Sequence, residues 1–472
     1  MRAMAIAPLM DQVFQWFSEQ AQKRVPVSGN NPYLKGAYAP VDVETTSTSL
    51  KVQGQIPEQL NGVFTRIGPN PISVPNPATH HWFIGEGMVH GLRLENGKAV
   101  WYRNRWIGTN NTNRQLNRPL APGKRHGIND TVNTNIIRHG GSNWAMVEAG
   151  ALPVELDDEL ETLQHSLFNS NAVGCFTAHP HLDPLTGELH AICYDAKQPF
   201  RIFYHVIDQQ GQLSRRVSIP VKHGPMVHDC AITTSQTILL DLPVTFSMRS
   251  LIKGARFPYQ WNKRHRARVG LLPRLGNRQD VRWFHLDPCY VFHTCNAFDA
   301  NDGSVVVDVV VHQRMFDNSI QGPEPQQVTL ERWTLPPDGD QVQRKVISSL
   351  SQEFPRFDER LATRAYRYIY TVGVELSKQD SPQPLYRHDV ESGARIHHDY
   401  GPQKISGEVI FIPRSDQGRE DDGWLLSYVY DLANNSSEVV ILNADDLDGE
   451  PQAIIKLPVR VPLGFHGNWL AD

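Results

Sequence analysis

Short apolar stretches recur along the whole chain, separated by polar turns rich in Gly, Asp, Asn and Pro such as "DPLTGE" and "DANDG". Clear examples are "GVFTRIG", "NWAMVEA", "ELHAICYDA", "RIFYHVID", "QTILLDLPV", "SVVVDVVVH", "EVIFIP", "WLLSYVYD" and "SEVVILNA". Alternating or continuous apolar runs of this length, bounded by turn residues, predict β-strands. Strands do not alternate with long helical patterns, so the sequence predicts an all-β fold and excludes a doubly wound sheet.

The number of strands favours one architecture among the all-β folds. A chain of 472 residues is longer than a lone sandwich or barrel needs, whereas a β-propeller of four-stranded blades uses many strands. No Trp-Asp or kelch-like period appears, so we expect irregular blades. No linker or low-complexity tract divides the chain, which predicts a single domain over residues 1–472.

Two segments depart from the strand pattern. A helical face is formed near the N-terminus by Met10, Val13, Phe14, Phe17 and Ala21. This periodicity predicts a helical extension within residues 1–30. The segment 245–280 is basic and aromatic, and we expect it to be an elaborated loop between strands.

The composition of the chain argues against nucleic acid as a partner, against disorder and against disulfides. The chain has 46 basic and 50 acidic residues, a balance that gives no electrostatic reason to expect nucleic acid. Hydrophobic residues make up 40% of the chain, which is enough for a large core and argues against disorder. The five cysteines are odd in number and form no Cys-x-x-Cys motif. We therefore expect reduced, mostly buried thiols rather than disulfides or a zinc ribbon.

The N-terminal residues carry no adequate apolar core for a secretory signal, and no stretch approaches 18 uninterrupted apolar residues. These features predict a cytoplasmic protein. The sequence leaves the oligomeric state open.

Histidines supply the candidate chemistry. Four of the 20 stand at the ends of predicted strands: His179, His228, His293 and His466. A metal-binding histidine has to be neutral, rigidly placed and supported by a hydrogen-bonding partner, which a strand end provides. The four are too far apart in sequence for one helix or loop to supply them. A propeller can bring them together because each blade sends residues toward the central axis.

Several segments, in this order, resemble the carotenoid cleavage oxygenases. They are "GQIPEQLNGVFTRIGPNP", "HHWFIGEGMVHGLRL", "TVNTNII", "FTAHPHLDPLTGE", "MVHDCAIT", "VFHTCNAFD", "EFPRFDER", "GEVIFIPR" and "KLPVRVPLGFHGNW". That family includes enzymes that cleave apocarotenoids and lignostilbenes, and the retinoid isomerase of the eye. The resemblance implies a seven-bladed β-propeller with a helical and loop cap over its top face and a central iron.

The family pattern assigns roles to individual residues. It implies four iron ligands, namely His179, His228, His293 and His466. It implies three supporting glutamates, with Glu148 on His228, Glu353 on His293 and Glu408 on His466. A carboxylate that accepts one ring N–H makes the other nitrogen the ligand and raises its basicity. Thr134 matches a family threonine close to the open iron position, with an ordinary strand threonine as the alternative.

The remaining histidines of these motifs are not expected to be ligands. His181 is interpreted as a structural hydrogen-bonding residue. The others are His165, His190, His80, His81 and His90. The glycines of "GEGMVHG" have the wrong spacing for a dinucleotide-binding loop.

Four neutral imidazoles with two free octahedral positions suit Fe(2+), whereas zinc prefers closed or three-ligand tetrahedral sites. The implied reaction is cleavage of a C=C bond in a carotenoid or apocarotenoid by O2, giving aldehyde or ketone products, with one iron per chain. Which bond is cut is not indicated. Alternatives are a stilbenoid-cleaving dioxygenase, a propeller hydrolase that uses metal-bound water, and a non-catalytic binding scaffold.

Two positions favour a polyene over a stilbene. Stilbene-cleaving relatives carry a Lys where His126 aligns and a Tyr where Trp106 aligns. An apolar polyene resides in membranes, and segment 245–280 mixes apolar residues with Lys253, Arg256, Lys263, Arg264, Arg266 and Arg268. This mixture predicts weak peripheral membrane contact, with the stretch 10–21 as a second candidate. The alternative is that both segments pack against the propeller.

Overall fold

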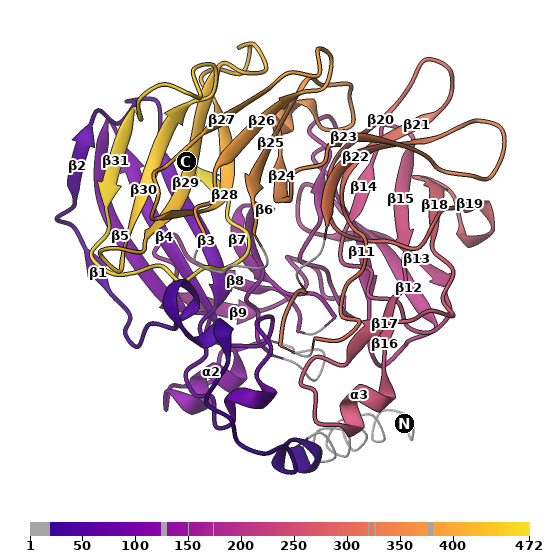
Figure 1. Ribbon diagram of the computed structural model, residues 1–472, viewed down its shortest axis with the longest axis horizontal. Helices are drawn as coiled ribbons and strands as arrows, with labels where there is room; N and C mark the ends of the chain where they lie inside the picture. Colours follow the sequence, from indigo (N-terminus) through magenta and orange to yellow (C-terminus); the bar gives the residue numbers. More distant parts are fainter. Residues whose placement is uncertain are drawn as a thin grey trace.

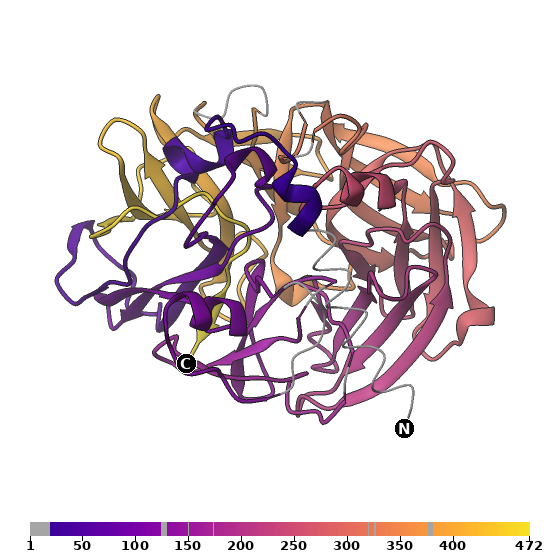
Figure 2. The same ribbon diagram turned by 90° about the horizontal axis from the view of Figure 1, so that it is seen from below.

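Seven antiparallel sheets of four or five strands form a seven-bladed β-propeller (Figure 1), which confirms the predicted fold class. The structure is a computed structural model that describes residues 19–123, 130–149, 151–172, 174–319, 321–324, 327–375 and 381–472. Seen from below, the chain runs round the molecule in sequence order, so that the yellow blade lies next to the indigo one (Figure 2). Every one of the nine segments quoted as a strand contains one.

The blades follow one another along the chain. Blade 1 contains β1 (Thr46–Ser47), β3 (Gly62–Pro69), β4 (Gly87–Glu95), β5 (Lys98–Trp106) and β32 (Trp469–Ala471). Blade 2 contains β6 (Asn135–His139), β7 (Ser142–Met146), β8 (Val154–Leu156) and β9 (Thr162–His165). Blade 3 contains β10 (His181–Leu182), β11 (Leu189–Tyr194), β12 (Arg201–Ile207) and β13 (Leu213–Pro220). Blade 4 contains β14 (Cys230–Ile232), β15 (Gln236–Asp241), β18 (Arg268–Pro273) and β19 (Arg282–His285).

The other three blades have the same plan. Blade 5 contains β20 (Tyr290–Asp299), β21 (Val305–His312), β22 (Val328–Leu335) and β23 (Gln343–Ser348). Blade 6 contains β24 (Gln352–Arg356), β25 (Tyr368–Gly373), β26 (Leu385–Asp389) and β27 (Arg395–His398). Blade 7 contains β2 (Lys51–Gly54), β28 (Lys404–Pro413), β29 (Gly423–Asp431), β30 (Ser436–Asn443) and β31 (Ala453–Lys456).

Two exchanged strands close the ring. The early strand β2 joins the edge of blade 7, where Lys51 pairs with Lys456. The last strand β32 joins blade 1, where Gly62 pairs with Ala471. Backbone hydrogen bonds from opposite ends of the chain therefore hold the first and last blades together, and they satisfy sheet edges that would otherwise be exposed.

The hydrophobic core lies between neighbouring blades. All eight residues of β21 and all nine of β29 are buried, because side chains on both faces of these strands pack against a neighbouring sheet. One cluster of buried residues spans blades 3, 4 and 5, and another joins blades 1 and 7. The continuous apolar runs in the sequence are thus strands covered on both sides.

Short helices and connections cover one end of the propeller (Figure 1). This cap contains α2 (Asn110–Gln115), α3 (Met248–Ile252) and the hairpin of β16 (Val244–Phe246) with β17 (Tyr259–Trp261). Five 3-10 turns complete the described helices: η1 (Pro32–Leu34), η2 (Gly36–Tyr38), η3 (Pro77–Thr79), η4 (Arg278–Asp280) and η5 (Glu359–Leu361). Residues 19–23 are helical, but most of the expected N-terminal helix lies outside the described residues.

The elaborated segment is shorter than the expected 245–280. Its last part forms β18, which pairs with β15 and β19 inside blade 4. Apolar residues of "RVGLLP" are buried in the blade core, so this stretch is a blade strand and not a loop. The excursion into the cap lies between β15 and β18.

Two predictions from composition can be compared with the structure. All five cysteines are free and buried, as expected. Among the described residues, no helix has both the length and the apolar character needed to cross a bilayer.

Candidate metal centre

Four histidines from four blades converge on the axis of the propeller. His179 precedes β10, His228 precedes β14, His466 precedes β32, and His293 lies in β20. One ring nitrogen from each lies within 4.8 Å of the corresponding atoms of the other three. The ring of His179 has its centroid 4.4 Å from that of His228, 5.2 Å from that of His293 and 4.6 Å from that of His466.

Irregularities in the sheets aim the side chains at this point. The register shifts within β20 between Val291 and Thr294, around His293. It shifts within β24 just after Glu353, and within β28 between Ser406 and Val409, around Glu408. A bulge turns side chains away from the regular alternation of a strand, so that a residue can face the axis.

Each of three histidines donates Nδ1–H to a glutamate from another blade. The distance to a carboxylate oxygen is 2.9 Å for His228 and Glu148, 2.6 Å for His293 and Glu353, and 2.9 Å for His466 and Glu408. These are the three pairs that the family resemblance implies. With Nδ1 donating, the lone pair on Nε2 is free to bind a metal.

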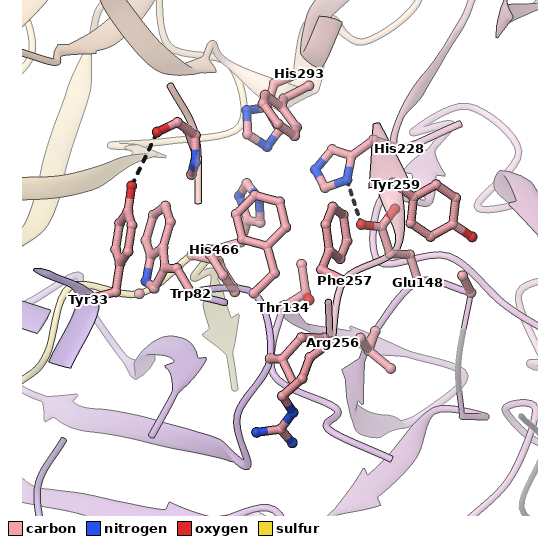
Figure 3. Close-up of a pocket in the computed structure, with 18 of the residues that line it drawn as sticks. Tyr33, Trp82, Thr134, Glu148, His228, Arg256, Phe257, Tyr259, His293 and His466 are labelled. Atoms are coloured by element: carbon pink, nitrogen blue, oxygen red, sulfur yellow. Dashed lines mark hydrogen bonds and ion pairs between the residues drawn. The ribbon is translucent and has the colours of Figure 1, made fainter. Parts of the chain in front are cut away.

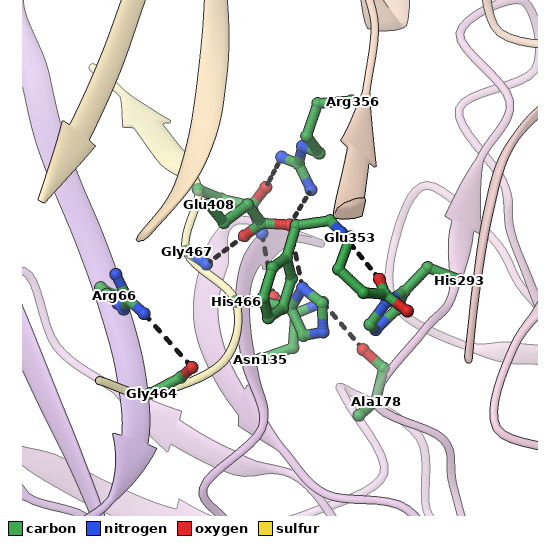
Figure 4. A network of polar contacts seen from close by, with 12 residues as sticks. Arg66, Asn135, Ala178, His293, Glu353, Arg356, Glu408, Gly464, His466 and Gly467 are labelled. Atoms are coloured by element: carbon green, nitrogen blue, oxygen red, sulfur yellow. Dashed lines mark hydrogen bonds and ion pairs between the residues drawn. The ribbon is translucent and has the colours of Figure 1, made fainter. Parts of the chain in front are cut away.

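Two of the carboxylates are held by further donors (Figure 4). Glu353 also accepts from His312 Nε2 at 2.6 Å and from the backbone N–H of Phe354 at 2.7 Å. Glu408 accepts from the backbone N–H of Gly467 at 2.9 Å, and the guanidinium of Arg356 lies 3.6 Å from it. Buried carboxylates need such partners, because an unpaired buried charge is unstable.

The protonation of the buried groups follows from these contacts. Although burial opposes ionisation, His466 and Arg356 hold the pKa of the Glu408 carboxyl at about 2. Burial, together with the neighbouring imidazoles, lowers the pKa of His179 well below its usual value. A neutral His179 keeps a lone pair for a metal, and the ionised glutamates offset the charge of a dication.

The donor set fits a divalent metal. Nε2 of His179 and Nε2 of His293 are buried, and neither has a hydrogen-bond partner among the described residues. Buried polar atoms are almost always paired, so two such nitrogens pointing at one place indicate a missing ligand. Four imidazoles with bracing carboxylates are a donor set typical of first-row transition metals.

His181 has a different environment, although it is two residues from His179. Its Nε2 lies 2.8 Å from Oδ1 of Asp229. The other oxygen of Asp229 accepts from the backbone N–H of Thr294 at 2.7 Å and from its hydroxyl at 3.0 Å. His181 is therefore a structural hydrogen-bonding residue, as interpreted from the sequence, and it connects blade 3 to blades 4 and 5.

The other histidines of the motifs lie away from the four-histidine cluster. His90 and His190 each have Nδ1 2.8 Å from a tyrosine hydroxyl, of Tyr102 and Tyr204 respectively, inside their blades. His165 is in β9 of blade 2. His81 accepts from the backbone N–H of Phe83 through Nδ1 and stacks on Phe257, and His80 follows η3.

A cavity of about 870 Å³ opens beside the cluster (Figure 3). His228, His293 and His466 line it together with Thr134. Most of its remaining wall is apolar and aromatic, including Trp82, Phe83, Phe257, Tyr259, Phe292, Phe354 and Phe465. A pocket of this size and polarity fits an elongated apolar molecule.

Trp106 and His126, the two positions that favoured a polyene over a stilbene in the sequence, provide little structural information on the substrate. Trp106 is not among the described residues that line the cavity, and its indole N–H donates to the carbonyl of Asn70 at 3.0 Å. It therefore does not distinguish substrates by direct contact. His126 lies outside the described residues.

Some residues of the centre were not found from the sequence. His312 ends the apolar run of β21, Asp229 directly follows His228, and Arg356 ends β24. A charged or polar residue at the end of a buried strand is a signal that could have indicated each of them. Their partners, however, lie in other blades and are distant in sequence.

The fold and the four-histidine cluster define a β-propeller whose central histidines could hold a metal ion. A family model described as "Retinal pigment epithelial membrane protein" matches residues 38–471. The "Carotenoid cleavage oxygenase" of Mycobacterium tuberculosis is 38% identical, over 93% of this chain and 97% of its own.

Solved structures agree with this match. The lignostilbene dioxygenase of Pseudomonas brassicacearum has a TM-score of 0.85 at 29% identity, over 95% of this chain and 100% of its own. The apocarotenoid oxygenase of Synechocystis has a TM-score of 0.81 at 25% identity, over 92% and 98%. The chain belongs to the carotenoid cleavage oxygenase family and is an enzyme of the oxygenase class.

Proposed function

We propose that this protein binds one Fe(2+) per chain through His179, His228, His293 and His466, and uses O2 to cleave a C=C bond of a carotenoid or apocarotenoid. The observation that carries the proposal is the convergence of four imidazoles, within 4.8 Å of one another, beside a large apolar cavity. Ferrous iron bound there would supply the binding and activation of O2.

The protein's own groups hold and surround the reacting atoms. Glu148, Glu353 and Glu408 orient three of the imidazoles through Nδ1, which keeps their Nε2 atoms pointing inward. The aromatic wall excludes water and fixes which part of a conjugated chain lies beside the histidines. Thr134 lines the same space, and its hydroxyl donates to Asn133 at 2.9 Å, so it is held in one orientation.

A carotenoid or apocarotenoid is the substrate class that the cavity supports best. Its volume of about 870 Å³ and its aromatic wall suit a long polyene. A relative with 38% identity is named a carotenoid cleavage oxygenase, and the Synechocystis structure is an apocarotenoid oxygenase. The lignostilbene dioxygenase structure keeps a stilbenoid as the second candidate substrate.

Metal analysis and product analysis test the proposal together. We expect about one iron per purified chain, no flavin or haem, and two carbonyl products identified by mass spectrometry from an apocarotenoid. Stoichiometric zinc that persists after reconstitution with Fe(2+) would contradict the metal assignment.

Parallel assays separate the other candidate functions. Apocarotenoid, carotenoid and resveratrol should be compared under identical conditions, and exclusive turnover of resveratrol would assign the stilbenoid function. An anaerobic assay distinguishes a hydrolase, because hydrolysis continues without O2 whereas the oxygenase reaction stops. Substrate binding without any turnover in the iron-loaded protein would indicate a scaffold.

Weak membrane association belongs to the same proposal. Met248 and Ile252 on α3 are 46% and 68% exposed, and Lys253 beside them is exposed. Apolar side chains next to a cation can enter the interface of an anionic bilayer. Met248 also lines the cavity, as do the less exposed Phe257 and Tyr259, and Arg268 pairs with Asp241 in blade 4. The docking surface is therefore smaller than the whole segment 245–280.

Co-sedimentation with anionic vesicles tests this surface. The wild type should pellet in part, and Ile252→Glu should reduce the pelleted fraction. Equal sedimentation of the variant and the wild type would rule out α3 as the contact. For the chain as a whole we propose one domain over residues 1–472, supported by the exchange of end strands between blades 1 and 7.

A further inference from the structure

Arg256 lines the cavity, although its sequence context predicts a surface cation. It lies in the cap between α3 and β17, on a backbone that is tied down on both sides. The N–H of Ala255 donates to the carbonyl of Ser250 at 3.1 Å, and the N–H of Ser247 donates to the carbonyl of Pro258 at 2.7 Å. The base of the side chain is therefore fixed.

The next residue adds to this rigidity. The ring of Phe257 stacks on His81 with centroids 4.4 Å apart, and it contacts Phe316 at 5.1 Å and Phe83 at 5.4 Å. A packed aromatic ring of this kind holds the backbone at Arg256 in place. In Figure 3 the guanidinium points away from His228, His293 and His466, so it lies at a distance from the metal centre.

The guanidinium of Arg256 differs from that of Arg66 in its contacts with the described residues. It forms no ion pair and no side-chain hydrogen bond with the described residues, whereas Arg66, on the same cavity wall, donates to the carbonyl of Gly464 at 3.2 Å. A guanidinium carries five N–H donors, and Arg256 is partly buried, so these donors lose part of their contact with water without an acceptor among the described residues, which is unfavourable. Burial accordingly lowers the pKa of Arg256.

A buried carboxylate balances part of this charge from a distance. Glu86 offsets the effect of burial on Arg256. Its own oxygens are taken by Asn111 Nδ2 at 2.7 Å, Gln115 Nε2 at 2.7 Å and the backbone N–H of Ile72 at 3.0 Å. The charge of Arg256 is thus partly compensated, while none of the described residues accepts a hydrogen bond from its guanidinium.

We propose that Arg256 binds an acceptor oxygen at one end of the polyene substrate, such as a hydroxyl, carbonyl or carboxylate oxygen, and thereby selects substrates oxygenated at that end. The inference rests on the proposed function and extends it to substrate selection. A hydrocarbon end would cover the guanidinium without supplying an acceptor. Leaving these N–H donors unpaired costs binding free energy, so a substrate without the oxygen is bound less well. Arg256 is a specificity-determining residue in this scheme, and it does not touch the bond that is cut.

Pairs of apocarotenoids of equal length that differ by one terminal oxygen test the assignment. In the wild type, kcat/KM should favour the oxygenated member by about 10- to 100-fold, the range expected for a hydrogen bond to a charged group. Arg256→Met should remove this preference through a higher KM for the oxygenated member, with a much smaller change in kcat/KM for the hydrocarbon member. Arg256→Lys should keep part of the preference.

Arg249→Met is a matched control, because Arg249 is an exposed arginine on α3 that does not line the cavity. It should leave the preference unchanged. An equal loss for both members in Arg256→Met, or an unchanged ratio, would overturn the inference.

A binding measurement separates this inference from the proposed reaction. Quenching of tryptophan fluorescence in metal-free protein reports the Kd of each member of a pair without turnover. Tighter binding of the oxygenated member that is lost in Arg256→Met supports the role of Arg256 even if cleavage fails. Equal Kd values for both members in the wild type count against it even if cleavage succeeds.

Discussion

Three of the four clustered histidines and the His181–Asp229–Thr294 contact, which we call the inter-blade clasp, come from neighbouring residues of the same three segments. His179 and His181 flank one proline, His228 precedes Asp229, and His293 precedes Thr294. Successive residues of an extended chain point to opposite sides, so His228 and Asp229 face opposite ways, as do His293 and Thr294. His179 and His181 are two residues apart and would share a side in a regular strand, but the chain at His179 is irregular and β10 begins only at His181. The same stretches of chain therefore supply both a candidate metal site and a structural contact.

The two regions differ in which ring nitrogen of each histidine forms a hydrogen bond. In the clasp, His181 uses Nε2 on Asp229, and Asp229 accepts from His181, Thr294 and the backbone N–H of Cys230. In the four-histidine cluster, Nδ1 of His228, His293 and His466 is used on a glutamate. Nε2 of His179 and of His293 has no hydrogen-bond partner among the described residues. The ability to bind a metal depends on which ring nitrogen remains free, and residue type alone does not determine it.

The largest expected difference between the two regions concerns the proposed iron ligands. His228→Ala, His293→Ala or His466→Ala should each abolish iron-dependent activity, a larger loss than the 10- to 100-fold typical of a supporting residue. His181→Ala should keep iron, because its Nε2 faces Asp229. Iron per chain by elemental analysis and O2 uptake measure both. Loss of iron in His181→Ala equal to that in His228→Ala would contradict the separation of the two regions.

The clasp should matter for stability rather than for metal binding. Asp229→Ala removes the acceptor of the N–H groups of Thr294 and Cys230, and each buried donor left without a partner costs about 1–3 kcal/mol. We expect a clear drop in the Tm of the metal-free protein, measured by calorimetry, with iron still bound after reconstitution. An unchanged Tm would show that the clasp does not stabilise the ring.

Substitution of the supporting glutamates should weaken iron binding to different extents. Glu353 accepts from His293, His312 and the backbone N–H of Phe354, whereas Glu148 accepts from His228. Glu353→Gln leaves one imidazole facing an amide N–H and should weaken iron binding by about 10- to 100-fold. Glu148→Gln still offers a carbonyl oxygen to His228, so its effect should be smaller. Competition with a chelator measures both affinities, and the reverse order would contradict this reasoning.

A smaller effect concerns pH. Gln352, next to Glu353 in β24, accepts from Nε2 of the buried His388 at 2.6 Å. Burial and the nearby Arg395 lower the pKa of His388 to about 4. The unfolded chain takes up this proton near pH 6.5 and the folded protein does not, so this contribution to stability is present above pH 6.5 and is lost as the pH falls toward 4.

Gln352→Glu should reverse this behaviour, because a carboxylate favours the protonated ring, as Glu353 raises the pKa of His293 against the effect of burial. Between pH 6 and 5, the stability of the variant relative to the wild type should rise by about 1 kcal/mol per pH unit. Urea midpoints at several pH values measure this difference. Parallel pH profiles for the two proteins would exclude the assignment.

Local pattern was enough for the strands and for the class of fold. The run "SVVVDVVVH" is β21, and "WLLSYVYD" lies within β29, because short apolar runs between turn residues depend on neighbours along the chain. The segment 245–280 shows the limit of this approach. Its basic residues predict a surface, yet Arg256 faces the cavity and Arg268 pairs with Asp241 inside blade 4.

The sequence by itself determined the all-β character, the strand-end histidines and, through the motifs of a known family, the pairing of three of them with glutamates. Only the tertiary structure decided which of two adjacent polar residues faces the cavity and which joins the blades. It also decided that Glu353 holds both His293 and His312, and that Arg256 lines the cavity without an ion pair or side-chain hydrogen bond to the described residues. The physical reason is that these contacts depend on ring closure by β2 and β32 and on bulges that rotate single side chains, and neither leaves a periodic signal in the sequence.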